Sequence, residues 1–87
     1  MALVPYKRTP TFTEDTVPAG LLRDHRTKAG VYGRIVVEAG RLELTTGEQV
    51  VVLGAGEEAI SQPEQTHSVK PLGMVRFYVE FCREEAG

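Results

Sequence analysis

The stretch MVRFYVEFC, residues 74–82, constrains the fold more than any other part of the chain. Its side chains alternate, so that one face carries the apolar residues Val75, Phe77, Val79 and Phe81. A period of two is typical of a strand with one buried face, whereas an amphipathic helix repeats about every 3.6 residues. Because no 11-residue window of the chain shows a convincing 3.6-residue period, the sequence predicts a chain built from strands.

Further strands are predicted at short intervals between glycine turns. VYGRIVVEA and RLELTT, residues 31–39 and 41–46, are expected to meet at a tight turn over Ala39-Gly40. Gly47 is expected to supply a positive φ for the hairpin from RLELTT to QVVVL, residues 49–53. Three prolines favour extended edge or loop structure in the first quarter, namely Pro5, Pro10 and Pro18. Strands at roughly 8–12-residue spacing indicate an all-β sandwich or small barrel.

The length of the chain limits its core. The 87 residues are predicted to be one domain, 1–87, with an ordered core over residues 5–83 and a frayed tail at 84–87. A chain this small buries only about 60% of the surface that its unfolded form exposes. A metal ion or a second subunit would add stability, and we expect a homodimer because open sandwiches expose strand edges.

Composition excludes several classes of partner. With 41% hydrophobic and 25% charged residues, the chain has the composition of an ordinary globular protein. Its formal net charge of −2 gives no general attraction to nucleic acid or to anionic membranes. Cys82 is the single cysteine, so nothing indicates an oxidising compartment. A cytoplasmic location is therefore the default expectation.

The two histidines, His25 and His67, are the first candidates for a site. If GLLRDHRT, residues 20–27, is a strand, His25 shares a face with Arg23, and His67 enters a later strand. Glu80 in the last strand could join them, and two imidazoles with one carboxylate can bind a divalent transition metal such as zinc, iron, nickel or manganese. The alternatives are incidental strand histidines and an exposed ion pair of Glu80 with a nearby arginine, worth about 0–1 kcal/mol.

Three more side chains are candidates for contact with a small ligand. Arg23 could hold an anionic ligand by bidentate hydrogen bonds. Tyr32 and Tyr78 could stack on a ligand or hydrogen-bond to it, the alternative being aromatics at the edge of the core. The charged neighbours of His25 are expected to be solvated, namely Asp24, Arg26 and Lys28.

The motifs together resemble a known family. VVEAGRLEL, residues 36–44, resembles the hairpin of cupins, and PEQTHSV, residues 63–69, resembles a shortened second cupin motif with its proline and histidine. With VRFYVEF, residues 75–81, the chain resembles the small cupin-like family of tellurite-resistance TehB/YeaR-like domains over roughly residues 5–83. The resemblance implies a cupin-type β-sandwich.

The resemblance also implies a ligand set. His25 falls at the first histidine of the first cupin motif, whereas Thr27 stands at the second histidine and Gly33 falls near the glutamate. Two of the four usual cupin ligands are therefore absent. The TehB/YeaR-like pattern carries an acidic residue in its last strand, which Glu80 matches, so the resemblance implies a metal site of His25, His67 and Glu80.

Three functions follow from these expectations. The favoured one is a small module that binds a divalent metal and a small ligand, related by its family to stress response or tellurite resistance. A metal-dependent enzyme of the non-haem iron oxygenase type is the second, since two histidines and a carboxylate leave coordination positions open. A metal-free β interaction module is the third. Catalytic residues are not evident from the sequence.

Overall fold

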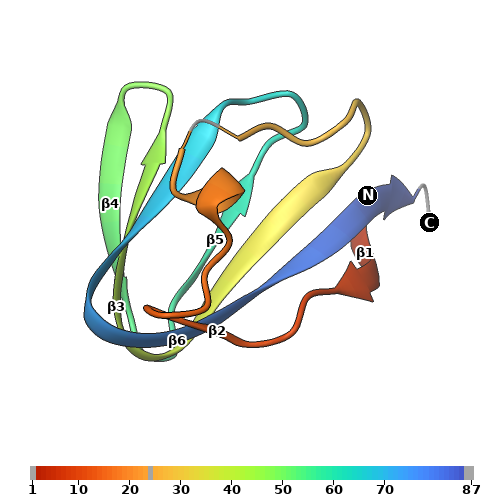
Figure 1. Ribbon diagram of the computed structural model, residues 1–87. Helices are drawn as coiled ribbons and strands as arrows, with labels where there is room; N and C mark the ends of the chain where they lie inside the picture. The colour runs from red at the N-terminus through yellow and green to blue at the C-terminus, as the bar shows by residue number, and fades with distance from the viewer. Residues whose placement is uncertain (1, 24, 86–87) are drawn as a thin grey trace.

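The computed structural model describes residues 2–23 and 25–85 and is almost entirely β-sheet, as Figure 1 shows. Met1, Asp24, Ala86 and Gly87 lie outside the described residues, and with them the expectation for Asp24. In chain order the elements are β1 (Ala2–Arg8), β2 (Phe12–Thr13), the 3₁₀ turn η1 (Ala19–Leu21), β3 (Tyr32–Thr46), β4 (Gln49–Gly54), β5 (Glu58–Ser61) and β6 (His67–Glu85). None of the helices in these ranges is long and apolar enough to cross a membrane.

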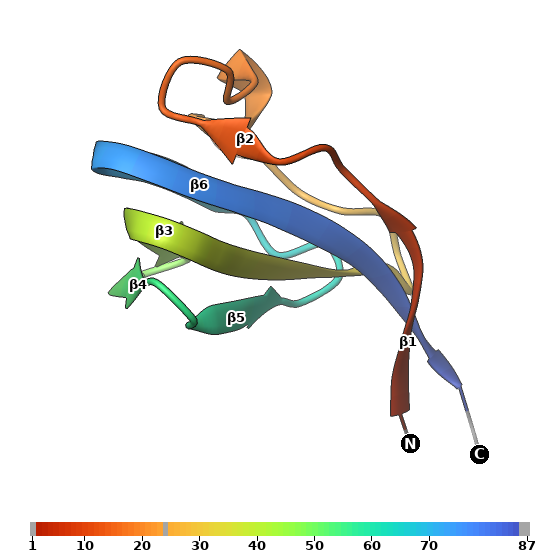
Figure 2. The same ribbon diagram turned by 90° about the horizontal axis from the view of Figure 1, so that it is seen from below.

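Two long strands, β3 and β6, organise the molecule. They pair antiparallel from Tyr32 opposite Cys82 to Thr46 opposite His67. The sheet order is β1-β6-β3-β4, with β2 added to β6 and β5 added to β3. Figure 2 shows β3 and β6 as long curved ribbons, with β2 and η1 on one side and β4 and β5 on the other. The prediction of an all-β fold built from antiparallel strands is confirmed.

The tight turn predicted at Ala39-Gly40 is wrong, because β3 continues through these residues. The pairing of β3 with β6 shifts register there, between Val37 and Ala39 and again between Gly40 and Leu42. Gly40 has a φ of 77°, and a Cβ at this position would collide with the backbone carbonyl of Met74. Gly40 therefore allows a bulge that bends the long strand β3, and the chain does not reverse there. By contrast, the hairpin predicted between β3 and β4 at Gly47 is confirmed.

The strand considered for GLLRDHRT is not present in the described residues of that segment. The 3₁₀ turn η1 at Ala19–Leu21 runs into its start, and a bend follows at Leu22–Arg23. Among the described residues of the segment, His25 forms an isolated bridge with His67. At the other end of the chain, β6 continues through Glu84 and Glu85, which pair with β1 where a frayed tail was expected.

The core lies between the curved halves of the sheet. Its centre is formed by the alternating residues of β6, where Phe77 is fully buried and meets Phe12 edge-to-face with ring centroids 5.6 Å apart. The buried apolar cluster among the described residues consists of Ile35, Val37, Leu42, Leu44, Leu53, Val69, Val75, Phe77 and Val79, and Cys82 is also fully buried. The inward face predicted from the C-terminal alternation is therefore confirmed.

Candidate functional site

The two histidines lie side by side on one face of the backbone. The His25 amide donates to the His67 carbonyl at 2.8 Å, and the His67 amide donates to the His25 carbonyl at 2.7 Å. Residues that exchange both hydrogen bonds in an antiparallel pair carry their side chains on the same face. The imidazole centroids are accordingly 5.2 Å apart, with the rings inclined at 75°. The convergence of His25 and His67 expected from the sequence is present.

His67 is held in one orientation inside the protein. Its Nδ1 lies 3.0 Å from the Ser61 hydroxyl and 3.3 Å from the Gln65 carbonyl oxygen. Burial lowers the pKa of His67 and the neighbouring His25 lowers it further, while the Gln65 carbonyl opposes them. The ring is therefore neutral at neutral pH. Because a carbonyl only accepts, it favours the tautomer with hydrogen on Nδ1, which leaves the lone pair on Nε2 free to bind.

His25 carries an unsatisfied nitrogen. Its Nδ1 is buried and has no hydrogen-bond partner among the described residues. Leaving a buried polar atom without a partner costs about 1–3 kcal/mol. Such atoms in a folded protein call for an explanation, and a bound ion or ligand is one.

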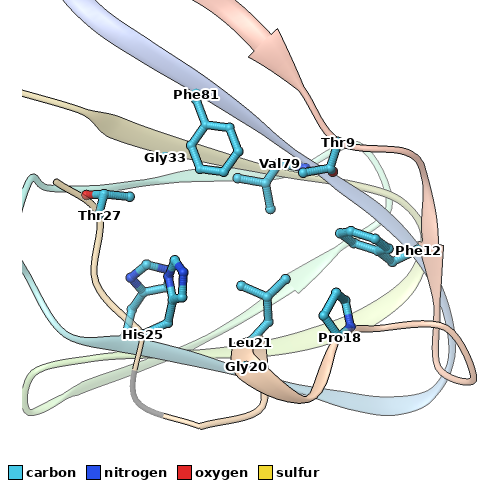
Figure 3. Close-up of a pocket in the computed structure, with 11 residues that line it drawn as sticks. Thr9, Phe12, Pro18, Gly20, Leu21, His25, Thr27, Gly33, Val79 and Phe81 are labelled. Atoms are coloured by element: carbon cyan, nitrogen blue, oxygen red, sulfur yellow. The ribbon is translucent and has the colours of Figure 1, made fainter.

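Both imidazoles open onto a cavity of about 240 Å³. Figure 3 shows His25 and Thr27 at one end of this cavity and Phe12 and Pro18 at the other. The cavity is lined by Thr9, Phe12, Pro18, Gly20, Leu21, His25, Thr27, Gly33, His67, Val79 and Phe81. Its walls are mainly apolar, which suits the body of a small molecule.

The threonine hydroxyls of the cavity lining are already engaged. Thr27 donates to the Val31 carbonyl at 2.7 Å. Thr9 donates to the Pro10 carbonyl at 2.9 Å and accepts from the Val79 amide at 3.0 Å. The imidazoles are thus the lining side chains with polar atoms left to bind a ligand, and both lie in the same part of the cavity.

Glu80 does not join the histidines. In β6 the side chains of Val79 and Phe81 line the cavity, so Glu80 between them points to the opposite face of the sheet. There its carboxylate pairs with Arg34 at 3.3 Å, which is one of the alternatives that the sequence left open. Among residues 2–23 and 25–85, no group of three or more histidine, cysteine or acidic side chains could hold a metal ion. Two of the three predicted ligands are brought together.

The predicted ligand-contact residues also lie elsewhere. Arg23 is exposed in a bend and does not line the cavity. The Tyr32 hydroxyl donates to Glu84 at 3.1 Å, and this hydrogen bond raises the pKa of Tyr32. Tyr78 stacks against the guanidinium of Arg8, whose central carbon is 3.6 Å from the ring centroid. Both tyrosines serve contacts of the outer surface.

Several residues of the site were not singled out as ligand contacts. Phe12, Leu21 and Phe81 form apolar walls, and of these only Phe81 had a sequence signal, its place on the inward face of β6. Thr27 and Gly33, which the resemblance aligned with two absent cupin ligands, do line the same cavity as the histidines. A Cβ on Gly33 would lie 3.7 Å from Ser61 Cβ and 3.8 Å from Val79 Cγ1, which is ordinary van der Waals contact, so the site admits a Cβ atom.

A family model described as the TehB-like domain matches residues 7–79. The chain belongs to the TehB-like domain family. No curated protein sequence matches it. The family assignment agrees with the resemblance drawn from the motifs.

Solved structures show that this TehB-like domain shares the fold of a cupin domain. A protein from E. coli (strain K12) is 25% identical with a TM-score of 0.82, over 95% of this chain and 93% of that one. TehB from Haemophilus influenzae is 23% identical with a TM-score of 0.81; 93% of this chain is covered, but it spans only 32% of TehB. The Schizosaccharomyces pombe Cnp3 cupin domain, 19% identical, has a TM-score of 0.68 over 95% of this chain and 63% of that domain.

Proposed function

We propose that this TehB-like domain is a small-molecule-binding module in which His25 and His67 hold one divalent transition metal at the end of the apolar cavity. The observation that carries the proposal is the buried, unpartnered Nδ1 of His25 beside the neutral ring of His67. Imidazole nitrogen is a good ligand for zinc, iron and nickel, with manganese a weaker candidate. The metal would polarise or anchor the bound molecule.

The geometry of the two rings supports a shared ion. With metal–nitrogen bonds of about 2.0–2.1 Å, two imidazoles on one tetrahedral ion have centroids about 5 Å apart. The observed separation is 5.2 Å. The hydrogen bond of His67 Nδ1 to a carbonyl is the type of outer contact that orients histidine ligands. Two protein ligands leave the remaining coordination positions to water or to the bound molecule.

Binding is favoured over catalysis. A two-histidine, one-carboxylate iron centre needs a carboxylate beside the imidazoles, whereas Glu80 pairs with Arg34 on the opposite face. The family's link to tellurite resistance suggests that the bound molecule belongs to a stress or oxyanion response. This role rests on family membership, and the whole of a longer relative such as TehB has other parts that the present chain does not span.

The decisive experiment measures metal affinity in variants of the two cavity histidines and of Glu80, which lies on the opposite face of the sheet. We expect protein purified without an affinity tag to bind zinc, iron(II), nickel or manganese, seen by elemental analysis and by a thermal shift on added metal. His25→Ala and His67→Ala should each weaken binding by at least about tenfold, because one ligand of two is lost. Glu80→Gln should bind as the parent does, and Lys70→Ala is a surface control. Histidine variants that retain metal as well as Lys70→Ala would exclude the site.

A gain-of-ligand variant provides an independent check. Gly33→Glu adds a carboxylate to the cavity wall at the position where the resemblance places the cupin glutamate. Metal affinity should rise by at least about tenfold, since a charged oxygen ligand is added to two neutral nitrogens. Gly33→Gln is the matched control, equal in size but neutral. Equal affinities for the two variants would contradict a metal at this end of the cavity.

A further inference from the structure

A second hollow lies against the other side of the histidine site. It has a volume of about 350 Å³ and is lined by Tyr6, Lys7, His25, Arg26, Thr27, Lys28, Val31 and Phe81. Three of these residues, His25, Thr27 and Phe81, also line the apolar cavity. The two hollows therefore adjoin at these residues, and the unpartnered Nδ1 of His25 belongs to a residue that borders both spaces. We call this second hollow the basic groove.

The charge of the basic groove differs from that of the chain as a whole. Lys7, Arg26 and Lys28 line it, and none of its lining residues within 2–23 and 25–85 is acidic, although the chain has a formal net charge of −2. All three cations are exposed, and none forms an ion pair with another residue of the described ranges. Cations gathered from β1 and from the segment after His25 create a local positive potential in a hollow of the surface.

The apolar cavity has the opposite character. A charged group placed among Phe12, Leu21 and Val79 would lose its water without gaining a cationic partner. Its volume of about 240 Å³ holds on the order of ten non-hydrogen atoms at protein packing density. The adjoining spaces thus suit the two ends of one molecule.

We propose that the ligand is a small organic anion with an apolar body, such as an aryl or branched-alkyl carboxylate, whose body fills the apolar cavity while its anionic head lies in the basic groove. This inference rests on the proposed function of the cavity as a small-molecule site. Lys7, Arg26 and Lys28 take the part that the sequence assigned to Arg23. The head would pass His25, where it can also complete the coordination of a metal held by the histidines.

The test compares molecules that differ in one property at a time. Phenylacetate and 3-methylbutanoate are the amphiphilic anions, phenylacetamide is the neutral isostere of the first, and acetate is a head without a body. Calorimetric titrations are run on the full chain with zinc and, separately, with metal chelated. We expect phenylacetate to bind at least about tenfold more tightly than phenylacetamide or acetate, and its affinity to fall with added salt.

Variants then locate the head and the body. Arg26→Ala and Lys7→Ala should each weaken phenylacetate by about threefold or more without changing phenylacetamide, and Lys70→Ala should change neither. Leu21→Trp, which fills the apolar cavity, should weaken both aromatic probes. Circular dichroism and thermal unfolding confirm that each variant is folded.

The outcomes separate this inference from the function on which it rests. If phenylacetamide bound as tightly as phenylacetate, and Leu21→Trp still weakened both, the ligand would not need an anionic group. The apolar cavity would remain a small-molecule site. If Lys70→Ala lost as much affinity for phenylacetate as Arg26→Ala, the loss would reflect the net charge of the protein. The basic groove would then not be the binding site of the anionic head. Absence of binding by every probe at millimolar concentration would overturn the inference, while metal binding by His25 and His67 would still be judged by its own experiment.

Discussion

The two faces of the β3–β6 pair carry different kinds of contact, although they alternate along the same strands. The inner face holds the buried core and continues into the apolar cavity with the histidines. The outer face is covered by polar and aromatic surface contacts: Arg34 with Glu80, Tyr32 with Glu84 and Arg8 with Tyr78. A difference of one residue in position decides which of these environments a side chain enters.

The comparison teaches where function can be placed in this small domain. The inner face excludes water, so the His67 imidazole is neutral. The Nδ1 of His25 is buried and has no hydrogen-bond partner among the described residues. On the outer face, Arg34 pairs with Glu80 through one terminal nitrogen, while its Nε is buried without a hydrogen-bond partner among the described residues. Partly exposed ion pairs of this kind contribute little to stability. The proposed site therefore uses the inner face, whereas the outer face carries side-chain contacts within the domain.

The largest expected difference between the faces is in stability. Phe77→Ala should lower the free energy of unfolding by about 3–5 kcal/mol, since it opens a cavity at a fully buried position. Tyr78→Ala, on the adjacent residue of the outer face, should cost about 1 kcal/mol through the lost contact with Arg8. Urea unfolding measures both, and Phe77→Leu provides a milder variant if the alanine variant does not fold. Equal costs at the two positions would contradict the division of faces.

The second expected effect concerns dimer formation, which depends on the free edge strands of the sheet. We propose that the chain is a homodimer joined through β4, which pairs only with β3 among the described strands and exposes Val50, Val51 and Val52. The β1 edge is a poorer partner, because it carries Pro5, a register shift and the charges of Lys7 and Arg8. Val52→Lys should convert the dimer to a monomer, and Val4→Lys on β1 should not. Light scattering that finds a single-chain mass for the parent at all micromolar concentrations would contradict the dimer.

The third effect is a pH dependence that comes from the inner face. The pKa of folded His67 is lowered, so the unfolded chain takes up a proton at a higher pH than the folded one. Stability from this group is complete above the unfolded value of about 6.5 and is lost as pH falls through that value toward the folded pKa. His67→Gln should remove this part of the pH dependence, while Glu80→Gln should keep it. Urea unfolding between neutral and mildly acidic pH measures the difference, and an unchanged slope in His67→Gln would refute it.

Much of this division could be predicted from the sequence. The alternation at residues 75–81 defined the inward face of β6, and that same alternation places Glu80 outward, although its match to the family pattern had suggested a ligand. The bridge between His25 and His67 was expected only in outline, because it joins an irregular segment to a strand through a contact distant in sequence. The bulge at Gly40 resembled a turn, since both use a glycine with positive φ.

The smallest expected effect concerns the outer ion pair of Arg34 and Glu80. Their side chains are 28% and 18% exposed, and the charged atoms are 3.3 Å apart. A pair with this degree of access to water should contribute about 0–1 kcal/mol, because solvent screens the attraction and ordering two side chains costs entropy. A double-mutant cycle with Arg34→Met and Glu80→Gln isolates this coupling from the effects of the single changes. A coupling of several kcal/mol would mean that the outer face contributes to stability as the core does. The same Glu80→Gln protein also tests the site, since loss of metal affinity in it would place the carboxylate among the ligands and remove the distinction between the two faces.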